Sequence, residues 1–374
     1  MCRKTHFSGV ICPVAKAARL PHGAPMIYAF ARPILFSLDA ETAHGVAIST
    51  LKALPAAPAP VPDPVLAICV AGLDFPNPIG LAPGFDKNAE AAHAMPWLGF
   101  GFAEVGTLTP RPQPGNDRPR LFRLAEDGAV INRMGFNNQG QGAAIDRLRR
   151  LRARPDHAIT GVNIGANKQS MADGTANADY VRGVEQMLPL ADYLTVNISS
   201  PNTPGLRALQ DKSALDALLA AVMETRGVNR TPIFLKVAPD LQPADIDDIV
   251  ALAHLHRLDA LIISNTTISR PAGLRSAQAS ETGGLSGAPL RDLALQRLKD
   301  FVAAGAQALP LIGVGGIASA EDAYARIRAG ASLIQIYSAM VYEGPMLARR
   351  INRGLKTLLA RDGFRNVAEA VGAQ

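Results

Sequence analysis

The sequence predicts an α/β fold, a closed (β/α)8 barrel with a small N-terminal helical extension. Eight short apolar runs alternate with helix-compatible stretches after residue 64, and such alternation is typical of a parallel sheet. Eight strand-helix units are the number that closes a (β/α)8, or TIM, barrel. An open, doubly wound sheet is the structural alternative, but it lacks the GxGxxG motif expected after its first strand.

The predicted strands and helices follow this rhythm along the chain. The strands are expected at residues 78–83, 102–107, 159–164, 192–197, 232–237, 259–264, 310–314 and 332–337. The helices are expected at residues 88–98, 141–152, 177–190, 213–226, 243–256, 289–304, 319–329 and 344–360. Two connections, 108–140 and 265–288, are long, and insertions of this length commonly build a binding site or a lid.

Residues 1–25 differ in composition from the rest of the chain. They contain four basic residues, no acidic residue and three prolines. This composition is compatible with a targeting segment, but the apolar region of a secretory signal is missing. We favour an upstream start, with Met26 as the true first residue, and assign residues 1–25 no role.

Residues 26–54 predict a pair of short helices. Ile27, Phe30, Ile34 and Leu38 recur at spacings of three and four, which places them on one helical face. By pattern alone, this face packs on the body more readily than on a membrane, although both interpretations remain open. Residues 55–64 contain five prolines and predict a stiff, extended linker. The barrel is therefore expected to cover residues 65–374.

The composition excludes several classes of function. The net charge of +6 falls to +2 without the four basic residues of 1–25, and aromatic residues make up only 5% of the chain, so no nucleic-acid partner is expected. No apolar run approaches the ~18 residues of a membrane span. The cysteines are Cys2, Cys12 and Cys69; none lies beyond residue 69, which excludes a thiol nucleophile in the main body and argues against a disulfide framework. The histidine spacing predicts no metal site.

Polar residues cluster where the predicted strands end, the place where (β/α)8 barrels carry their active sites. Amides, hydroxyls and two lysines, Lys87 and Lys236, dominate these positions, and carboxylates are almost absent. Such a lining suits a planar, anionic ligand with many hydrogen-bonding edges. The GVGG turn at 313–316 predicts a phosphate site. Lys236 is compatible with a Schiff base or with charge neutralisation of a cofactor, and its presence does not decide between them.

Five longer motifs carry a resemblance to a known family. They are PRPQPG at 110–115, NRMGFN at 132–137, NISSPNTPGLR at 197–207, TGGLSG at 282–287 and IGVGGI at 312–317. Together they resemble the quinone-dependent, membrane-associated class 2 of the dihydroorotate dehydrogenase family, over residues 26 to about 360. The resemblance implies oxidation of dihydroorotate to orotate in pyrimidine (UMP) biosynthesis, with FMN as electron carrier and a quinone as acceptor. It includes the helical pair, which the soluble class lacks, and therefore favours membrane contact for residues 26–54.

The resemblance also assigns roles to individual residues. It implies that Ser200 is the base that removes the C5 proton of dihydroorotate, with Ser199, Thr203 and Thr266 as candidates, by residue type, for passing the proton on. The implied substrate-binding residues are Lys87, Asn132, Arg133, Met134, Gly135, Phe136, Asn197, Asn202, Asn265 and Thr266. The implied FMN-binding residues are Pro83, Gly84, Phe85, Asp86, Lys87, Thr107, Asn163, Asn197, Lys236, Ser264, Gly287, Gly316, Tyr337 and Ser338. Pro83 and Ser264 depart from the family, in which alanine and threonine are more common, and Pro83 cannot donate a backbone hydrogen bond to the flavin.

At the helical pair, the resemblance implies a quinone tunnel lined by His44, Arg123 and Tyr337. It also implies a monomer attached peripherally to the inner membrane, with the bacterial cytoplasmic side favoured. Three alternatives remain: a soluble dehydrogenase using fumarate or NAD, a phosphate-sugar lyase using Lys236 as Schiff base, and a barrel that binds ligand without turnover. The serine at 200, in place of the cysteine of the soluble class, argues against the first.

Overall fold

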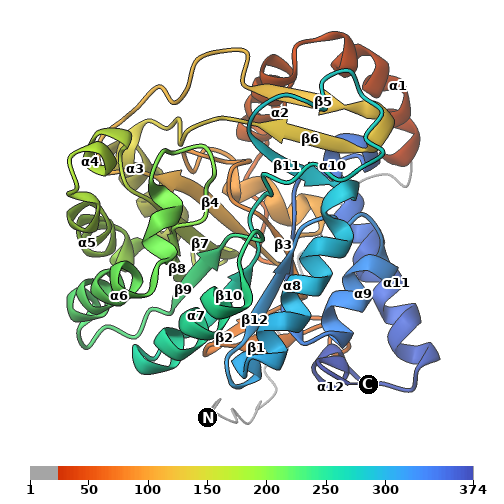
Figure 1. The fold of residues 1–374 in the computed structure, drawn as a ribbon. Coiled ribbons are helices and arrows are strands. Elements are labelled where there is room, and N and C mark those ends of the chain that lie inside the picture. The colour runs from red at the N-terminus through yellow and green to blue at the C-terminus, as the bar shows by residue number, and fades with distance from the viewer. Residues whose placement is uncertain (1–23, 374) are drawn as a thin grey trace.

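A closed parallel barrel forms the body of the molecule (Figure 1). A computed structural model describes residues 24–373, so the predictions for residues 1–23 lie outside the described part. The eight barrel strands are β3 (Ile79–Leu81), β4 (Phe102–Leu108), β7 (Ile159–Ile164), β8 (Tyr193–Asn197), β9 (Ile233–Val237), β10 (Ala260–Ile263), β12 (Leu311–Val314) and β13 (Ala331–Ile336). Each strand pairs with its sequence neighbours in the barrel, and β13 closes the ring on β3. The (β/α)8 prediction is confirmed, with a strand in each of the eight expected runs.

Helices surround the barrel and cover its outer face (Figure 1). They are α3 (Gly140–Arg152), α4 (Lys168–Ala172), α5 (Ala176–Met187), α6 (Lys212–Arg226), α7 (Pro243–Leu255), α8 (Arg291–Ala303), α9 (Ala320–Arg328), α10 (Met340–Glu343), α11 (Leu347–Arg361) and α12 (Val367–Ala370). The expected helix at 88–98 is wrong in type, because residues Ala92–Leu98 form a 3-10 helix. Pro96 removes a backbone donor there, and Gly99 ends the segment with a φ of 95°.

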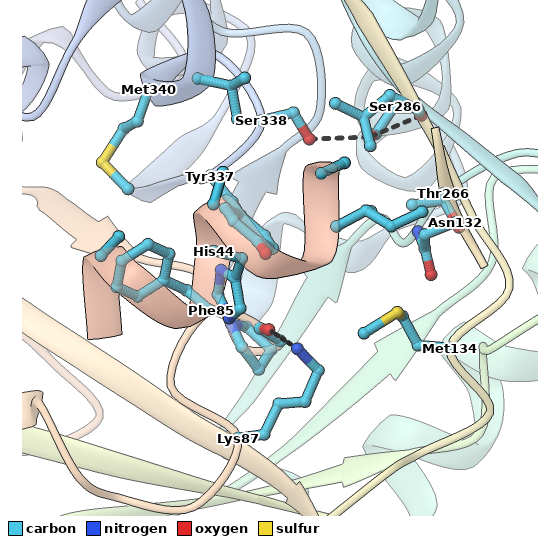
Figure 2. A pocket seen from close by; sticks show the side chains of 18 of the residues that line it. His44, Phe85, Lys87, Asn132, Met134, Thr266, Ser286, Tyr337, Ser338 and Met340 are labelled. Carbon is cyan, nitrogen blue, oxygen red and sulfur yellow. Dashed lines mark hydrogen bonds between the residues drawn. The ribbon is translucent and has the colours of Figure 1, made fainter. Parts of the chain in front are cut away.

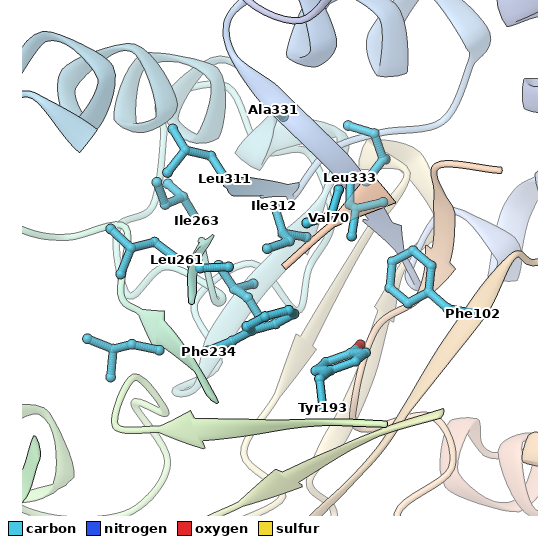
Figure 3. Packing of buried hydrophobic residues seen from close by; sticks show 14 of the residues in the cluster. Val70, Phe102, Tyr193, Phe234, Leu261, Ile263, Leu311, Ile312, Ala331 and Leu333 are labelled. Atoms are coloured by element: carbon cyan, nitrogen blue, oxygen red, sulfur yellow. The ribbon is translucent and has the colours of Figure 1, made fainter. Parts of the chain in front are cut away.

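Aromatic rings fill the lower part of the barrel. Phe102, Tyr193 and Phe234 follow one another across its interior, with centroid distances of 6.3 and 4.5 Å (Figure 3). Glycines on neighbouring strands make room for these rings: a Cβ on Gly80 would lie 2.2 Å from the Phe102 ring, and one on Gly161 would lie 2.1 Å from the Tyr193 ring. The rings therefore restrict open space to the other end of the barrel.

A β-hairpin that the sequence analysis did not predict lies at the N-terminal end of the barrel strands (Figure 1). It consists of β1 (Ile68–Val70) and β2 (Leu73–Phe75), and Phe75 packs edge-on against Phe102 at 5.0 Å. Cys69 of β1 is disulfide-bonded, a bond that the sequence analysis, which argued against a disulfide framework, did not predict.

The two long connections meet in a separate small sheet at the C-terminal end of the barrel (Figure 1). Strands β5 (Leu121–Leu124), β6 (Ala129–Asn132) and β11 (Gly284–Gly287) pair antiparallel in the order β11-β6-β5. Phe122, Ile131 and Leu285 belong to its own small core. The sequence analysis placed an insertion at both positions without predicting strands, because each strand is only four residues long and lies among turn residues.

The helical pair forms as predicted, with α1 at Ala24–Ser37 and α2 at Ala40–Ala53. Asp39 begins α2, and its carboxylate accepts a hydrogen bond from the Thr42 backbone N–H at 2.8 Å. Residues 55–63 form neither helix nor strand, in line with the expected linker, but their backbone is hydrogen-bonded to the barrel through Ala57 and Ala59. Within residues 24–373, no helix is both long and apolar enough to span a membrane.

Candidate active site

Two adjoining cavities lie at the C-terminal end of the barrel, where the helical pair and the small sheet cover it. The main cavity, of about 510 Å³, runs from α1 and α2 down to the strand ends (Figure 2). The glycine cavity, of about 250 Å³, lies between Lys236 and the Gly315–Gly316 turn. Lys236, Asn265 and Tyr337 line both cavities, so the two lie side by side.

The structure brings most of the predicted site residues together here. The main cavity is lined by His44, Pro83, Gly84, Phe85, Lys87, Thr107, Arg123, Asn132, Met134, Gly135, Phe136, Asn197, Ser200, Asn202, Lys236, Asn265, Thr266, Tyr337 and Ser338. The glycine cavity adds Ser264, Gly287 and Gly316.

Five predicted residues line neither cavity; two of them, Ser199 and Thr203, are buried on the loop after β8. Asp86 is buried, and its carboxylate accepts the backbone N–H groups of Glu90 and Ala91 at 2.8 and 2.7 Å, which holds the loop after β3. Arg133 points away, forms an ion pair with Glu281 at 2.6 Å and thereby ties the two insertions together. Asn163 lies one layer below the cavity floor, within the barrel.

A row of buried amides and hydroxyls lies at the floor of the main cavity and directly below it. Thr107 donates its hydroxyl to Asn163 Oδ1 at 2.6 Å, and Asn197 donates its amide to both Thr107 Oγ1 and Asn163 Oδ1 at 3.0 Å. Ser199 donates its hydroxyl to Asn197 Oδ1 at 2.8 Å and accepts from Asn265 Nδ2 at 2.9 Å. These side chains come from four strand ends, β4, β7, β8 and β10, so the barrel itself sets their relative positions.

Ser200 follows β8 on the loop beside this row. It is 7% exposed, and its hydroxyl oxygen accepts the Asn202 backbone N–H at 3.2 Å. Asn202 also donates its side-chain amide to Asn132 Oδ1 at 3.1 Å, which joins this loop to the small sheet. The buried hydroxyls of Thr203 and Thr266 have no hydrogen-bond partner among residues 24–373. The Ser199 hydroxyl already donates to Asn197. Of the three hydroxyls proposed to pass the proton on, those of Thr203 and Thr266 therefore have an unused donor.

Two lysines supply the positive charge of the site. Lys87 donates to the Gly84 carbonyl at 2.7 Å (Figure 2), and desolvation in the cavity wall lowers its pKa to about 8. Burial also lowers the pKa of Lys236, and the Glu104 carboxylate opposes that shift. Neither ammonium has a carboxylate within 4 Å among the described residues. Both charges are thus available to an anionic ligand.

Glu104 is a functional candidate that the sequence analysis missed. It is fully buried in β4, inside the barrel and below the amide row. A signal for it exists in the sequence: an acidic residue in the otherwise apolar run of a strand buried on both faces needs a partner.

Backbone shape defines the glycine cavity. Gly287 and Gly316 have φ values of 95° and 70°. A Cβ on Gly316 would lie 2.3 Å from the Arg291 Cα, and one on Gly287 would lie 2.4 Å from the Gly128 carbonyl oxygen. These positions therefore require glycine. The buried guanidinium of Arg326 donates to the Gly315 carbonyl at 2.9 Å and holds the turn from behind. Close backbone with free N–H groups at a strand end suits a phosphate.

The other end of the main cavity is largely apolar. His44 of α2 packs edge-on against Phe85 at 5.2 Å, and Tyr337 packs edge-on against the same ring at 5.6 Å (Figure 2). Burial and then the Lys87 charge lower the pKa of His44 to about 3, so this imidazole is neutral at physiological pH. Arg123 lines this end too, and its guanidinium donates to the carbonyls of Leu35, Phe36 and Leu38 at the end of α1.

A buried ion pair joins this apolar end to the substrate-side loops. Arg120 is 7% exposed and forms two hydrogen bonds with the Glu41 carboxylate of α2, at 2.7 and 3.1 Å. The same guanidinium donates to the carbonyls of Pro114 and Asn116 at 2.6 and 2.8 Å. Asn116 in turn donates to the backbone carbonyl of Asn202 at 3.0 Å. Arg120 thus connects α2 with the loop that carries Asn202, a connection the sequence analysis did not predict.

Comparisons with known proteins agree with this geometry. The family model described as "Dihydroorotate dehydrogenase" matches residues 65–359. The protein named "Dihydroorotate dehydrogenase (quinone)" from Sphingopyxis alaskensis is 62% identical over 347 residues, covering 92% of this chain and 96% of the relative. A protein of the same name from Novosphingobium aromaticivorans is 62% identical over 93% of this chain and 99% of its own length.

Solved structures agree as well. The crystal structure of the enzyme from Eimeria tenella in complex with ferulenol has a TM-score of 0.83 at 42% identity, covering 89% of this chain and 94% of that one. The ligand-free form from the same organism has a TM-score of 0.84 at 41% identity. The fold, the cavity lining and these similarities together show that the chain belongs to the dihydroorotate dehydrogenase family.

Proposed function

We propose that the protein oxidises dihydroorotate to orotate in pyrimidine biosynthesis and passes the electrons to a quinone. The observation that carries this proposal is the continuous cavity, which joins a polar floor with Ser200 and two lysines to an apolar mouth between α1 and α2. A polar, cationic floor suits a small carboxylated ring, and an apolar mouth suits a quinone. Relatives that are 62% identical carry the name of this activity.

The family is flavin-dependent, and we assign FMN as the cofactor. In the glycine cavity, Gly287 and Gly316 have positive φ values, and their backbone leaves room for a single phosphate to approach closely. Lys236 lies where this cavity meets the main one, so the phosphate and a planar ring fit the two cavities as neighbours. When bound, FMN would take the hydride from dihydroorotate and pass electrons to the quinone. The cation of Lys236 would stabilise negative charge beside it.

The residues of the chain supply orientation and proton removal. Ser200 is the proposed base for the C5 proton, and its buried position keeps bulk water from competing. Asn132, Asn202 and Asn265 present side-chain amides to the ring, and Lys87 faces its carboxylate. Thr203 and Thr266, whose buried hydroxyls have no hydrogen-bond partner within residues 24–373, are the proposed groups for passing the proton onward.

The helical pair is the proposed entry for the quinone from a membrane surface. Phe30 and Ile34 of α1 are 79% and 69% exposed, which leaves large apolar side chains without partners within the described chain. Tyr337 lines both cavities and so lies between the two proposed ligands, with His44 and Arg123 on the quinone side. We further propose a monomer, bound peripherally to the inner membrane from the bacterial cytoplasmic side.

An anaerobic titration tests both half-reactions. The purified yellow protein should bleach on addition of dihydroorotate and regain its colour on addition of a ubiquinone analogue. A protein that dihydroorotate does not bleach refutes the substrate assignment. Trapping of substrate on Lys236 by borohydride would support the lyase alternative, and reoxidation by fumarate or NAD in place of quinone would support the soluble-dehydrogenase alternative. If deletion of residues 26–54 leaves the turnover of long-tail quinones unchanged, the tunnel is refuted.

A further inference from the structure

A single carboxylate lies inside the barrel, below the amide row. Glu104 Oε1 accepts the Asn163 side-chain amide at 2.7 Å, while Oε2 accepts the Tyr193 hydroxyl at 3.1 Å and the Gln335 side-chain amide at 2.6 Å. A carboxylate offers acceptors only. All three neighbours must therefore turn a donor toward Glu104.

This requirement fixes the orientation of the next amide. Because the Asn163 Nδ2 group donates to Glu104, the Oδ1 atom of Asn163 must face Thr107 and Asn197, from which it accepts hydrogen bonds at 2.6 and 3.0 Å. Asn197 consequently turns Nδ2 toward Asn163 and Thr107, and its own Oδ1 toward Ser199. Each amide has only one orientation that satisfies its neighbours.

The row ends at the ligand. The Ser199 hydroxyl donates to Asn197 and so has only a lone pair left for its other neighbour, which forces Asn265 to donate Nδ2 at 2.9 Å. The side-chain Oδ1 of Asn265 accepts the Thr266 backbone N–H at 2.8 Å. One N–H of Asn265 remains, and this residue lines both cavities. The hydrogen-bond direction that Glu104 sets is thus passed on through five side chains to the cavity floor: Asn163, Thr107, Asn197, Ser199 and Asn265.

We infer that Glu104 is a positioning residue that sets the direction of the hydrogen bonds from Asn163 to Asn265, and thereby fixes the donors presented to the bound ring. The inference rests on the proposed function, since the ring is the pyrimidine. Glu104 touches no ligand. It acts by making the donor-and-acceptor pattern of the floor unique, and its charge adds to the field around Lys236.

Glu104→Gln tests this role with almost no change in volume. The glutamine amide has both a donor and an acceptor, so Asn163 and the amides beyond it are no longer held in one orientation. We expect the orotate dissociation constant of the holoenzyme, read from the flavin spectrum, to rise by roughly tenfold. Loss of a buried negative charge should also raise the flavin midpoint potential. Tyr193→Phe is the matched control, because it removes one donor to Glu104 but leaves the carboxylate and Asn163 unchanged.

The outcomes separate the possibilities. Weaker orotate binding and a raised potential in Glu104→Gln, with both values close to wild type in Tyr193→Phe, support the inference. An unchanged Glu104→Gln, or equal losses in both variants, overturns it. A neutron structure of the wild-type holoenzyme gives a test that needs no variant: the Asn163 amide must point its deuterons at Glu104, and the reverse orientation overturns the inference. Failure of dihydroorotate to bleach the wild-type protein refutes the proposed function instead.

Discussion

The floor and the mouth of the main cavity are held in place by different forces. On the floor, the side chains of Thr107, Asn163 and Asn197 are hydrogen-bonded to one another across neighbouring barrel strands. At the mouth, the rings of His44 and Tyr337 both pack edge-on against Phe85 and lie tilted relative to each other, in largely apolar contacts. Directional bonds specify one ligand, whereas apolar contact selects by size and shape. The two ends should therefore respond differently to substitution.

The largest expected effect is on the floor. Ser200→Ala should keep FMN and orotate binding but slow flavin reduction by dihydroorotate about 100-fold or more, because a general base is lost. Anaerobic stopped-flow spectroscopy at the flavin band measures this rate. Reoxidation of the dithionite-reduced variant by quinone is the internal control and should match wild type. Reduction at the wild-type rate would remove Ser200 from the mechanism.

At the mouth, a steric block should separate the half-reactions. Ala47 of α2 lines the cavity, and Ala47→Phe should raise the quinone KM roughly tenfold by filling apolar space, with flavin reduction by dihydroorotate unchanged. Ser49→Phe places the same ring on an exposed position of α2 that does not line the cavity, and should behave as wild type. Equal KM values for the two variants, measured with a long-tail quinone, would count against the tunnel.

A third prediction concerns pH and the floor alone. The pKa of Lys87 is lowered to about 8 by burial, so its charge is present below that pH and lost above it. Orotate affinity should be flat between pH 6 and 7.5 and fall by up to about tenfold per pH unit above 8. Titration of the flavin spectrum with orotate follows the change. The arginine of Lys87→Arg keeps its charge across this range, so the orotate affinity of this variant should not fall above pH 8. An equally steep fall in the variant would assign the titration to another group.

The smallest expected effect concerns the connection between the two ends. Arg120→Lys keeps the charge but loses the paired hydrogen bonds to Glu41, and should cost about 1–3 kcal/mol of stability. Because Arg120 also holds Asn116, the KM for dihydroorotate should rise several-fold. Arg118 contacts the same carboxylate but is 73% exposed, so Arg118→Lys should change neither value. Thermal unfolding and initial rates distinguish the two variants.

What the sequence could predict depended on periodicity and on local motifs. The barrel strands are apolar runs with polar ends, so both their position and the residues around the cavity could be read directly. The small sheet could not, because β5, β6 and β11 are four residues long and the pairing of β11 with β6 joins positions about 150 residues apart. Glu104 and Arg120 were missed for a related reason. An acid in a buried strand is a signal for Glu104, but its partners, like those of Arg120, are brought near only by the fold.

The Glu41–Arg120 ion pair limits how freely this architecture can be recombined. In sequence, the helical pair is set apart from the barrel by a proline-rich segment, as a removable module would be. Yet a carboxylate on α2 completes the hydrogen bonds of a guanidinium that shapes the loop next to Asn202. A chimera with a new helical pair must therefore keep an acid at position 41. Without it, the buried Arg120 cation is left uncompensated, and the floor of the main cavity changes shape.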